Sequence, residues 1–448
     1  MTFRERLMLA CAGLLLASCI TVFLRYGTYQ FLIRDFRINN AWTTAIFADQ
    51  PTLQQYQAPQ PTPPEEVPMD WNAQYPSPEE PATPTPPQEN AIQQGERHFR
   101  EQVGKFSAWS NQKFFSYMSF VEAMQCYQHA IHWNIPLYSD LYSFAELPDG
   151  RLTGFFRKTD VSRPASQTAS FAAFCRENGI NFLFVLAPNK ISREEPYNGT
   201  LDFSNENGDD FLAQLKKKGI DVLDLRPVLD EQVEKRADLF FRTDHHWHPQ
   251  TARSAAQAIA HELNIRYGYT ADLSLFSPSR YSERIYPAHH LGSYGQRLTL
   301  ARTQPDDFPL FYSKFPALFR LQIPSMAIDH TGDFSVFYYM KELDFSHGFY
   351  GSYAYGTYAY GERALLSIQN QNKSDGRKLL LVRDSFSDAM IPFFALSMEQ
   401  LDAIDVRRFT GSLRSYLQKE RPDTVVVCYT ISELNWNQTN RRDIFSLR

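Results

Sequence analysis

The chain has 448 residues and contains a run of six consecutive apolar residues, Phe182-Leu-Phe-Val-Leu-Ala187. A strand that buries one face alternates apolar with polar residues, whereas a continuous apolar run is typical of a strand buried on both faces. Such strands lie inside parallel sheets that are covered by helices on either side. Three further stretches have the same character: 222–225, 378–383 and 424–429. Together they predict the inner strands of one parallel sheet.

Patterns typical of helices separate these strands. They cover residues 165–177, 209–218, 249–263 and 413–420. Gly179 and Gly219 follow two of them, at the position where a left-handed glycine commonly ends a helix. Strands that alternate with helices of this length indicate βαβ units. The predicted fold class is therefore α/β, with a mainly parallel sheet and flanking helices.

Residues 267–372 interrupt this alternation, because they are rich in Tyr, Phe, Gly and Pro and contain few helical patterns. We expect one irregular insertion, with some short strands of its own, that packs beside the sheet. Two interpretations fit its tyrosines: they stack on sugar rings, or they form one face of a strand that packs on the core. These residues are Tyr350, Tyr353, Tyr355, Tyr358 and Tyr360.

Charge and cysteine content argue against several classes of protein. The chain carries 45 Lys and Arg against 50 Asp and Glu, a net charge of −5, and has no basic cluster of the kind that binds nucleic acid. Its five cysteines form no C-x-x-C pair, which argues against a thiolate zinc site or a disulfide scaffold. With 43% hydrophobic residues, the chain has ample material for a globular core.

The N-terminus predicts export to a membrane surface. Residues Leu7 to Leu24 contain no charge, and 18 residues of helix span roughly 27 Å, just enough for a bilayer core. We expect residues 1–25 to be an uncleaved anchor of a single-pass protein of the cell membrane, whose remainder is extracytoplasmic. A lipoprotein signal ending at Cys19 and a cleaved signal peptide are the alternatives, and both also export the chain.

Residues 26–94 are predicted to be a juxtamembrane segment followed by a Pro-rich linker. Twelve prolines fall between Pro51 and Pro87, and aliphatic residues are almost absent. Such a stretch buries too little apolar area to offset its conformational entropy. We therefore expect an extended, semi-rigid stalk that holds the body, residues 95–448, away from the membrane.

In an open parallel sheet, ligands bind beyond the carboxyl ends of the strands. Asn189 and Lys190 follow the strand at 182–187, where they either contact substrate or form a solvated turn. Ser385 lies at the corner between the strand at 378–383 and a helix expected near Ser387. A serine at such a corner is a candidate nucleophile with backbone amides beside it, although the pattern alone favours a helix N-cap.

A second candidate stretch, Asp244-His-His-Trp-His248, precedes a proline that suits the first position of a helix. In a tight Asp-x-His loop, the carboxylate fixes the imidazole tautomer while the other ring nitrogen faces a nucleophile, which favours Asp244 with His246. The histidines, together with His289 and His290, also permit a metal site, although no paired thiolates or H-E-x-x-H pattern supports one. A third interpretation is structural, with the histidines at the helix start and Trp247 in the core.

Several short motifs occur together between residues 130 and 448. They are Asp244-His-His-Trp247, Arg383-Asp-Ser-Phe-Ser387 about 140 residues later, Pro188-Asn-Lys190, Leu291-Gly-Ser-Tyr-Gly295 and the segment 404–409. In this combination the chain resembles the DHHW protein family of bacteria. That family is similar to the periplasmic alginate O-acetyltransferases, whose catalytic domains are SGNH-hydrolase-like.

The resemblance implies a triad of Asp244, His246 and Ser385, with Ser385 as the nucleophile. From the position of Ser385 at a strand-to-helix corner, we expect the backbone amides of Ser385 and Phe386 to be the oxyanion donors. It implies O-acetylation of an extracellular polysaccharide without a cofactor. Because acetyl-CoA does not cross the membrane, it also implies a multi-pass membrane acyltransferase as the donor partner. An esterase with the same triad and a catalytically silent, surface-anchored glycan-binding or scaffold protein are the alternatives. Two departures from the alginate enzymes are Asp384 directly before Ser385 and the second histidine at His245.

Overall fold

The computed structural model describes residues 69–76, 126, 145–147, 149–344, 349–436 and 444–447. The predicted anchor at residues 1–25 and most of the predicted linker at 26–94 lie outside these ranges. Among the described residues, no helix combines the length and the apolar character needed to cross a bilayer.

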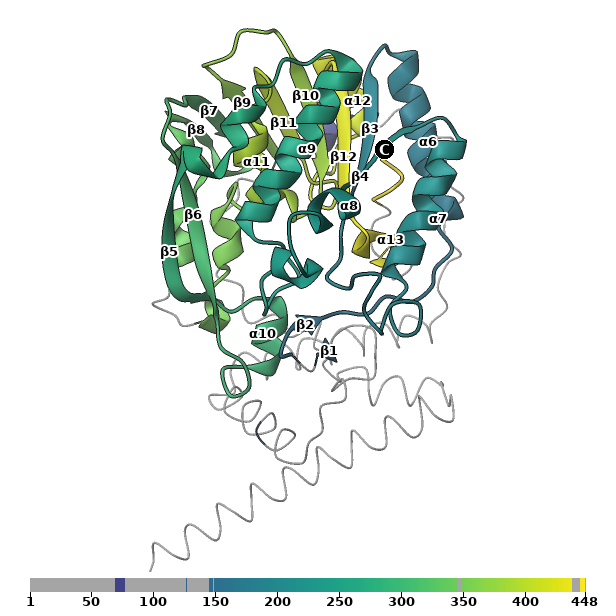
Figure 1. Ribbon diagram of the computed structural model, residues 1–448. Helices are drawn as coiled ribbons and strands as arrows, with labels where there is room; N and C mark the ends of the chain where they lie inside the picture. The colour runs from purple at the N-terminus through teal and green to yellow at the C-terminus, as the bar shows by residue number, and fades with distance from the viewer. Residues whose placement is uncertain are drawn as a thin grey trace, which may run out of the picture. The chain divides into compact units, whose positions relative to one another are not determined.

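Eight strands form one sheet: β3 (Asn181–Ala187), β4 (Asp221–Asp224), β7 (Phe319–Ile323), β8 (Ile328–Gly332), β9 (Leu365–Asn370), β10 (Lys378–Arg383), β11 (Gln400–Ile404) and β12 (Thr424–Thr430). Their order is β4-β3-β12-β10-β11-β9-β7-β8 (Figure 1). Neighbours from β4 to β11 are parallel, whereas β9, β7 and β8 join antiparallel. The four strands predicted from apolar runs are confirmed as β3, β4, β10 and β12, and β11 was not predicted.

Helices cover both faces of this sheet, as the continuous apolar runs predict. Leu183 and Val185 of β3 belong to one hydrophobic cluster with α9 (Pro249–Tyr267) and α11 (Ser387–Phe394). Phe182 and Phe184 belong to a second cluster with α6 (Ser162–Glu177), α7 (Ser204–Lys217) and α12 (Leu413–Glu420). Alternate side chains of one strand therefore fill two cores. The shorter helices are α3 (Trp71–Gln74), α8 (Leu225–Asp230), α10 (Ser293–Leu298) and α13 (Ser432–Trp436).

The predicted helices exist, with small differences at their ends. α9 begins at Pro249 as expected but continues to Tyr267, where Gly268 ends it in a left-handed conformation with φ 67°. α7 begins at Ser204, before the expected start. Gly179 and Gly219 both have positive φ, as the capping pattern predicts.

The insertion at 267–372 differs from the expectation. Part of it does lie outside the main sheet, because β5 (Tyr281–His290) and β6 (Asp306–Ser313) pair only with each other. A second two-stranded sheet, formed by β1 (Ala145–Glu146) and β2 (Leu152–Thr153), precedes the insertion in the chain. However, β7, β8 and β9 extend the main sheet instead of packing beside it. β7 reads Phe-Arg-Leu-Gln-Ile and alternates buried with more exposed residues, so no continuous apolar run reveals it.

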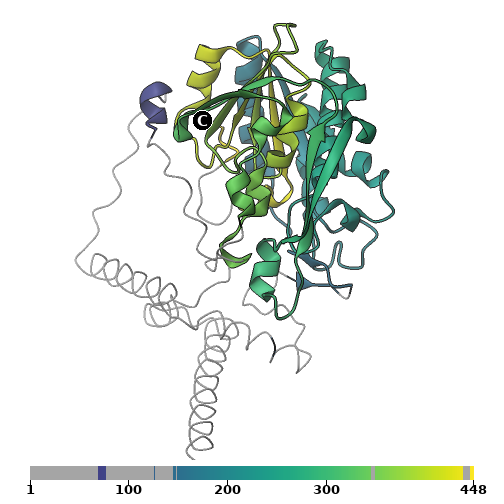
Figure 2. The same ribbon diagram turned by 90° about the vertical axis from the view of Figure 1, so that its left-hand side faces the viewer.

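One piece of the predicted linker is folded, which corrects the expectation of an extended stalk at that point. Trp71 is 4% exposed, and its ring centroid lies 5.2 Å from that of Phe409. The Tyr75 ring lies 4.8 Å from that of Tyr416 on α12, and its carbonyl accepts a 2.8 Å hydrogen bond from Ser412 N–H. α3 is the short purple helix in Figure 2. Two aromatic residues four positions apart supply the apolar area that a count of aliphatic residues overlooks.

Candidate active site

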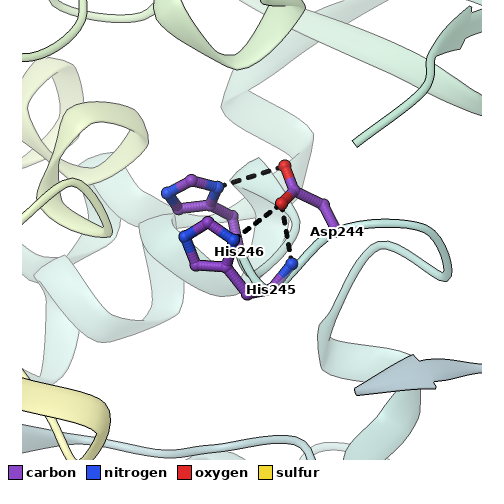
Figure 3. A group of neighbouring side chains, drawn as sticks. All are labelled: Asp244, His245 and His246. Carbon is purple, nitrogen blue, oxygen red and sulfur yellow. Dashed lines mark hydrogen bonds and ion pairs between the residues drawn. The ribbon is translucent and has the colours of Figure 1, made fainter. Parts of the chain in front are cut away.

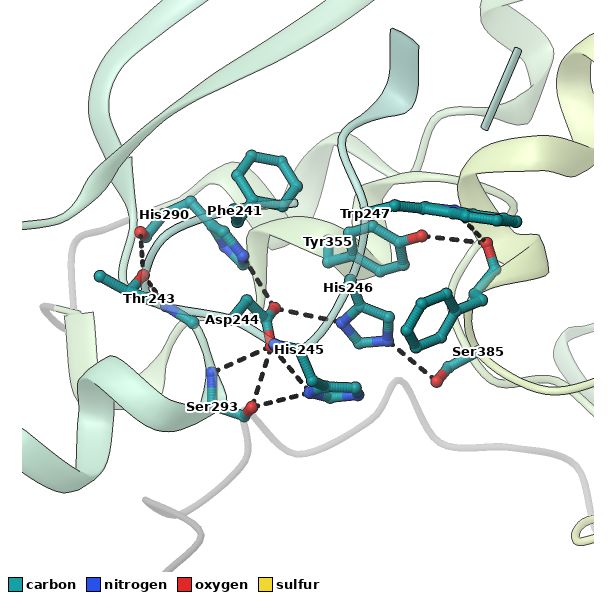
Figure 4. A network of polar contacts seen from close by, with 12 residues as sticks. Phe241, Thr243, Asp244, His245, His246, Trp247, His290, Ser293, Tyr355 and Ser385 are labelled. Atoms are coloured by element: carbon teal, nitrogen blue, oxygen red, sulfur yellow. Dashed lines mark hydrogen bonds and ion pairs between the residues drawn. The ribbon is translucent and has the colours of Figure 1, made fainter. Parts of the chain in front are cut away.

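Ser385 lies at the corner between β10 and α11, and its hydroxyl makes no capping hydrogen bond to the helix. The N-cap position of α11 belongs to Phe386, and no side chain caps this helix. The Ser385 side chain instead places Oγ 2.9 Å from Nε2 of His246 (Figure 4). Ser385 is 6% exposed. The interpretation of Ser385 as a helix cap is therefore not supported.

His246 connects Ser385 to Asp244. Its Nδ1 lies 3.1 Å from Oδ2 of Asp244, and the side chains of both residues are 1% exposed. Because a carboxylate only accepts hydrogen bonds, Nδ1 of His246 carries the proton and Nε2 is left to accept one from the serine hydroxyl. The structure thus brings Asp244, His246 and Ser385 into one continuous series of hydrogen bonds, in which each group has the direction that proton transfer from the serine requires.

The Asp244 carboxylate has additional partners that sequence reasoning missed. Nε2 of His290, at the end of β5, lies 2.9 Å from Oδ2. The Ser293 hydroxyl donates to Oδ1 at 2.9 Å, and the His245 backbone N–H donates to the same atom at 2.7 Å. His290 was considered only as a metal ligand, and Ser293 only as part of a motif. Both act on Asp244 because the insertion folds back over the Asp244 loop.

The motif at 291–295 packs directly against this loop. A Cβ atom added at Gly292 would lie 2.2 Å from Cβ of Asp244, so only glycine fits there. Gly292 N–H donates a 3.0 Å hydrogen bond to Oγ1 of Thr243. Thr243 in turn donates from its backbone N–H to Oδ2 of Asp306 on β6 at 2.8 Å. The Leu-Gly-Ser-Tyr-Gly pattern was the signal in the sequence that could have located these contacts.

Trp247 and Tyr355 hold the corner that carries Ser385. Nε1 of Trp247 donates to the Phe386 carbonyl at 2.9 Å, and the Tyr355 hydroxyl donates to the same oxygen at 3.0 Å. The Tyr355 ring also stacks on His246, with centroids 3.9 Å apart and planes 13° apart. Tyr355 is buried in the 3₁₀ turn η9 (Ala354–Thr357), so it neither lies on a strand nor is open to a sugar ring.

Asp384 stabilises the same corner and alters the expected oxyanion site. Its Oδ1 accepts the Phe386 backbone N–H at 3.1 Å, and its Oδ2 accepts the Thr430 N–H at the end of β12 at 2.7 Å. The Phe386 amide, predicted to be an oxyanion donor, is therefore already bonded. The Ser385 amide has no hydrogen-bond acceptor among the described residues. Burial raises the pKa of Asp384.

Lys190 has a different position from the one expected for a substrate-binding residue. It is 2% exposed, and Nζ donates to the carbonyls of Leu152 at 2.7 Å, Phe241 at 2.6 Å and Arg242 at 3.3 Å. Burial lowers its pKa to about 7. Lys190 thus anchors the loop that leads into Asp244. Asn189 is partly exposed and donates weakly to the Ser204 hydroxyl at 3.4 Å.

The site controls the ionisation of its base. Burial and, to a smaller extent, the neighbouring His245 lower the pKa of His246 to about 4, although Asp244 opposes both effects. For Asp244, burial acts to raise the pKa, but the imidazoles of His246 and His245 outweigh it and hold the pKa well below its usual range. At neutral pH the site therefore contains a carboxylate and a neutral imidazole with a free lone pair on Nε2.

A metal site at the same place was the other interpretation of the histidine-rich loop. Within the described ranges, Asp244, His245 and His246 can offer three ligand atoms that lie within 4.8 Å of one another (Figure 3). The Nδ1 atoms of both histidines face the Asp244 carboxylate. A metal ion that took these atoms would replace the hydrogen bonds that orient His246, so the two interpretations exclude each other and can be separated by chelation.

Comparison with known proteins identifies the domain. Residues 158–308 match the family model described as the SGNH hydrolase-like domain of the acetyltransferase AlgX. The match supports an SGNH-like α/β fold with a mainly parallel sheet. The match includes Asp244 and His246 but ends before Ser385. Ser385 therefore comes from a part of the chain outside the match, and the folding of the chain places it beside His246. No curated protein sequence matches the chain.

Solved structures agree with this fold. A structure of Bacillus cereus PatB1 with a sulfonyl adduct is 20% identical, with a TM-score of 0.55, and the alignment covers 69% of this chain and 100% of that one. A DHHW family protein from Eubacterium siraeum is 18% identical, with a TM-score of 0.50 over 65% and 91% of the two chains. Together with the family match, these two structures confirm the resemblance stated from the sequence motifs.

Proposed function

We propose that this protein is an extracytoplasmic O-acetyltransferase that uses Ser385 as a nucleophile and a polysaccharide hydroxyl as the acceptor. The observation that carries the proposal is the position of His246, whose two ring nitrogens lie 2.9 Å from Oγ of Ser385 and 3.1 Å from Oδ2 of Asp244. Support also comes from the match to an acetyltransferase domain. The predicted anchor at residues 1–25 and a multi-pass membrane acyltransferase as acetyl donor are parts of the same proposal.

In the first half-reaction, His246 Nε2 takes the Ser385 proton as Oγ attacks the acetyl carbonyl of the donor. Asp244 stabilises the imidazolium through Nδ1, and the Ser385 backbone amide is the available donor to the tetrahedral oxyanion. The donor's leaving group departs with the proton from His246, which leaves acetyl-Ser385 and a neutral imidazole. The low pKa of His246 keeps this base unprotonated before the attack.

In the second half-reaction, a sugar hydroxyl gives its proton to His246 as its oxygen attacks the acetyl carbon. The bond from the acetyl carbon to Ser385 Oγ then breaks, and Oγ recovers a proton from His246. If water takes the place of the sugar, the same steps make an esterase. The choice between the two depends on which acceptor occupies the site.

The proposal is tested by trapping the acetyl-enzyme. We expect p-nitrophenyl acetate to add about 42 Da to the intact protein, the mass of one acetyl group in place of hydrogen. Ser385→Ala should abolish the adduct. Ser387→Ala should keep it, because Ser387 is a buried serine two positions away that has no hydrogen bond to His246. An adduct that survives in Ser385→Ala would refute the proposed nucleophile.

Two further measurements separate the alternatives. A phenyl sulfonyl fluoride should label Ser385 and block the acetyl adduct, since sulfonylation requires the same activated hydroxyl. A chelator should leave the adduct unchanged; its loss on chelation and return with zinc would favour the metal site instead. If the wild type forms no adduct and cells that carry Ser385→Ala keep the wild-type phenotype, the protein is the catalytically silent scaffold.

A further inference from the structure

His245 and His246 share one carboxylate but differ in exposure. Nδ1 of His245 lies 2.9 Å from Oδ1 of Asp244, and Nδ1 of His246 lies 3.1 Å from Oδ2. Their ring centroids are 3.8 Å apart (Figure 3). The His245 side chain is 38% exposed, whereas that of His246 is 1% exposed. Asp244 therefore orients two neighbouring imidazoles, one buried and one open to solvent.

The contacts of His245 determine which ring nitrogen carries its proton. Nδ1 lies 2.8 Å from Oγ of Ser293, and this hydroxyl donates to Oδ1 of Asp244 at 2.9 Å. Because the Ser293 proton is directed at the carboxylate, its oxygen accepts from His245, and Nδ1 carries the proton in the neutral ring. Nε2 is then an acceptor with a free lone pair. No group among the described residues bonds to Nε2 of His245.

The exposed ring also lies on the side of the nucleophile. Both imidazoles extend from Asp244 toward the side on which Ser385 lies (Figure 4). His246 uses its Nε2 for Ser385, while the His245 ring centroid lies 5.9 Å from that of Phe386, the residue after the nucleophile. A second substrate that approaches acetyl-Ser385 from solvent therefore meets an acceptor atom whose direction is set by Ser293 and Asp244.

We propose that His245 forms the acceptor subsite, where its Nε2 accepts a hydrogen bond from a hydroxyl next to the one that is acetylated. The inference rests on the proposed function. The reacting hydroxyl still gives its proton to His246, the new bond forms to the acetyl carbon, and Ser385 Oγ leaves with that proton, so His245 does not change protonation. A group that only accepts hydrogen bonds selects polyhydroxy compounds over carboxylates or phosphates.

The test measures how the acetyl-enzyme divides its acetyl group between glycerol, a minimal polyol, and methanol, which has no second hydroxyl. With p-nitrophenyl acetate as donor, we expect the wild type to prefer glycerol by roughly threefold to tenfold, the contribution of one neutral hydrogen bond. His245→Asn keeps a donor near the Nδ1 position and removes Nε2, so the preference should disappear. His245→Gln should restore part of it, because its amide oxygen can accept from the second hydroxyl.

The same samples report the formation of the acetyl-enzyme by intact mass without added acceptor. An unchanged preference in His245→Asn would overturn the acceptor subsite and leave the proposed function intact. A loss of acetyl-enzyme formation by more than about tenfold in a folded His245→Asn protein would also overturn it, since His245 would then act by positioning Asp244. If the wild type forms no acetyl-enzyme, both the subsite and the proposed function are wrong.

Discussion

Gly292→Ala tests how far the site depends on close packing between the insertion and the Asp244 loop. The added methyl group would lie 2.2 Å from Cβ, 2.6 Å from Cα and 2.7 Å from Cγ of Asp244. Gly292 has φ −66° and ψ 177°, which any residue adopts, so the substitution adds no backbone strain of its own. Its effect therefore comes from the steric overlap with Asp244.

The size of the effect follows from the overlap. Carbon atoms in contact are normally about 3.5–4.0 Å apart, so the loop and the motif must separate by more than about 1 Å. A displacement of that size at a catalytic group costs on the order of a hundredfold in rate. Overpacking by one methyl group also destabilises a protein by about 1–3 kcal/mol. We expect both effects in Gly292→Ala.

The assay is the rate of acetyl-enzyme formation from p-nitrophenyl acetate, with urea denaturation to measure the free energy of unfolding. Gly332→Ala is the matched control, because its added methyl group meets Val336 only at 3.4 Å, an ordinary contact. A rate within about threefold of the wild type in Gly292→Ala would refute the reasoning. An equal loss in Gly332→Ala would refute it as well, since a general sensitivity to alanine would then explain the result.

Three further outcomes are expected. Because burial lowers the pKa of His246 to about 4, the rate of acetyl-enzyme formation should be constant from about pH 6 upward. It should fall only as the pH approaches 4, where the imidazole gains a proton and can no longer act as the base. A midpoint near pH 6.5 in the rate–pH profile would contradict this prediction. Lys190→Met leaves three carbonyl oxygens without their donor, so the free energy of unfolding measured in urea should fall by roughly 3 kcal/mol. Lys217→Met, at an exposed position, is the control and should change this free energy little. Equal free energies of unfolding for the two variants would show that Lys190 does not stabilise the loop. Trp71→Ala should speed proteolysis within residues 69–76 by about tenfold or more, since burial of an aromatic side chain stabilises the packed segment by roughly 2 kcal/mol. Gln74→Ala, at an exposed position of the same helix, is the control. Equal proteolysis rates in the two variants would mean that the packing of α3 does not depend on Trp71.

Several elements could be predicted because their signals are local. β3 is a continuous apolar run, α9 begins at a proline, and Gly179 and Gly219 follow helices with positive φ. β7 could not be predicted in the same way, because its alternation of Arg and Gln with apolar residues also suits an exposed loop or a separate hairpin. The packing of α3 against the body was also not predicted from the sequence. A four-residue helix in a proline-rich segment is too short to show the periodic spacing of apolar residues that indicates a helix.

The candidate site divides in the same manner. The sequence by itself determined that Asp244 and His246 lie two residues apart in a loop before a helix, and that Ser385 lies at a strand-to-helix corner. It left open whether Ser385 caps the helix or faces a base. Only the tertiary structure decided that Ser385 meets His246, that His290 and Ser293 share the Asp244 carboxylate, and that Lys190 binds backbone carbonyls. The physical reason is that each of these hydrogen bonds joins segments far apart in the chain, and its direction is set by how the strands, helices and insertion pack together rather than by neighbouring residues.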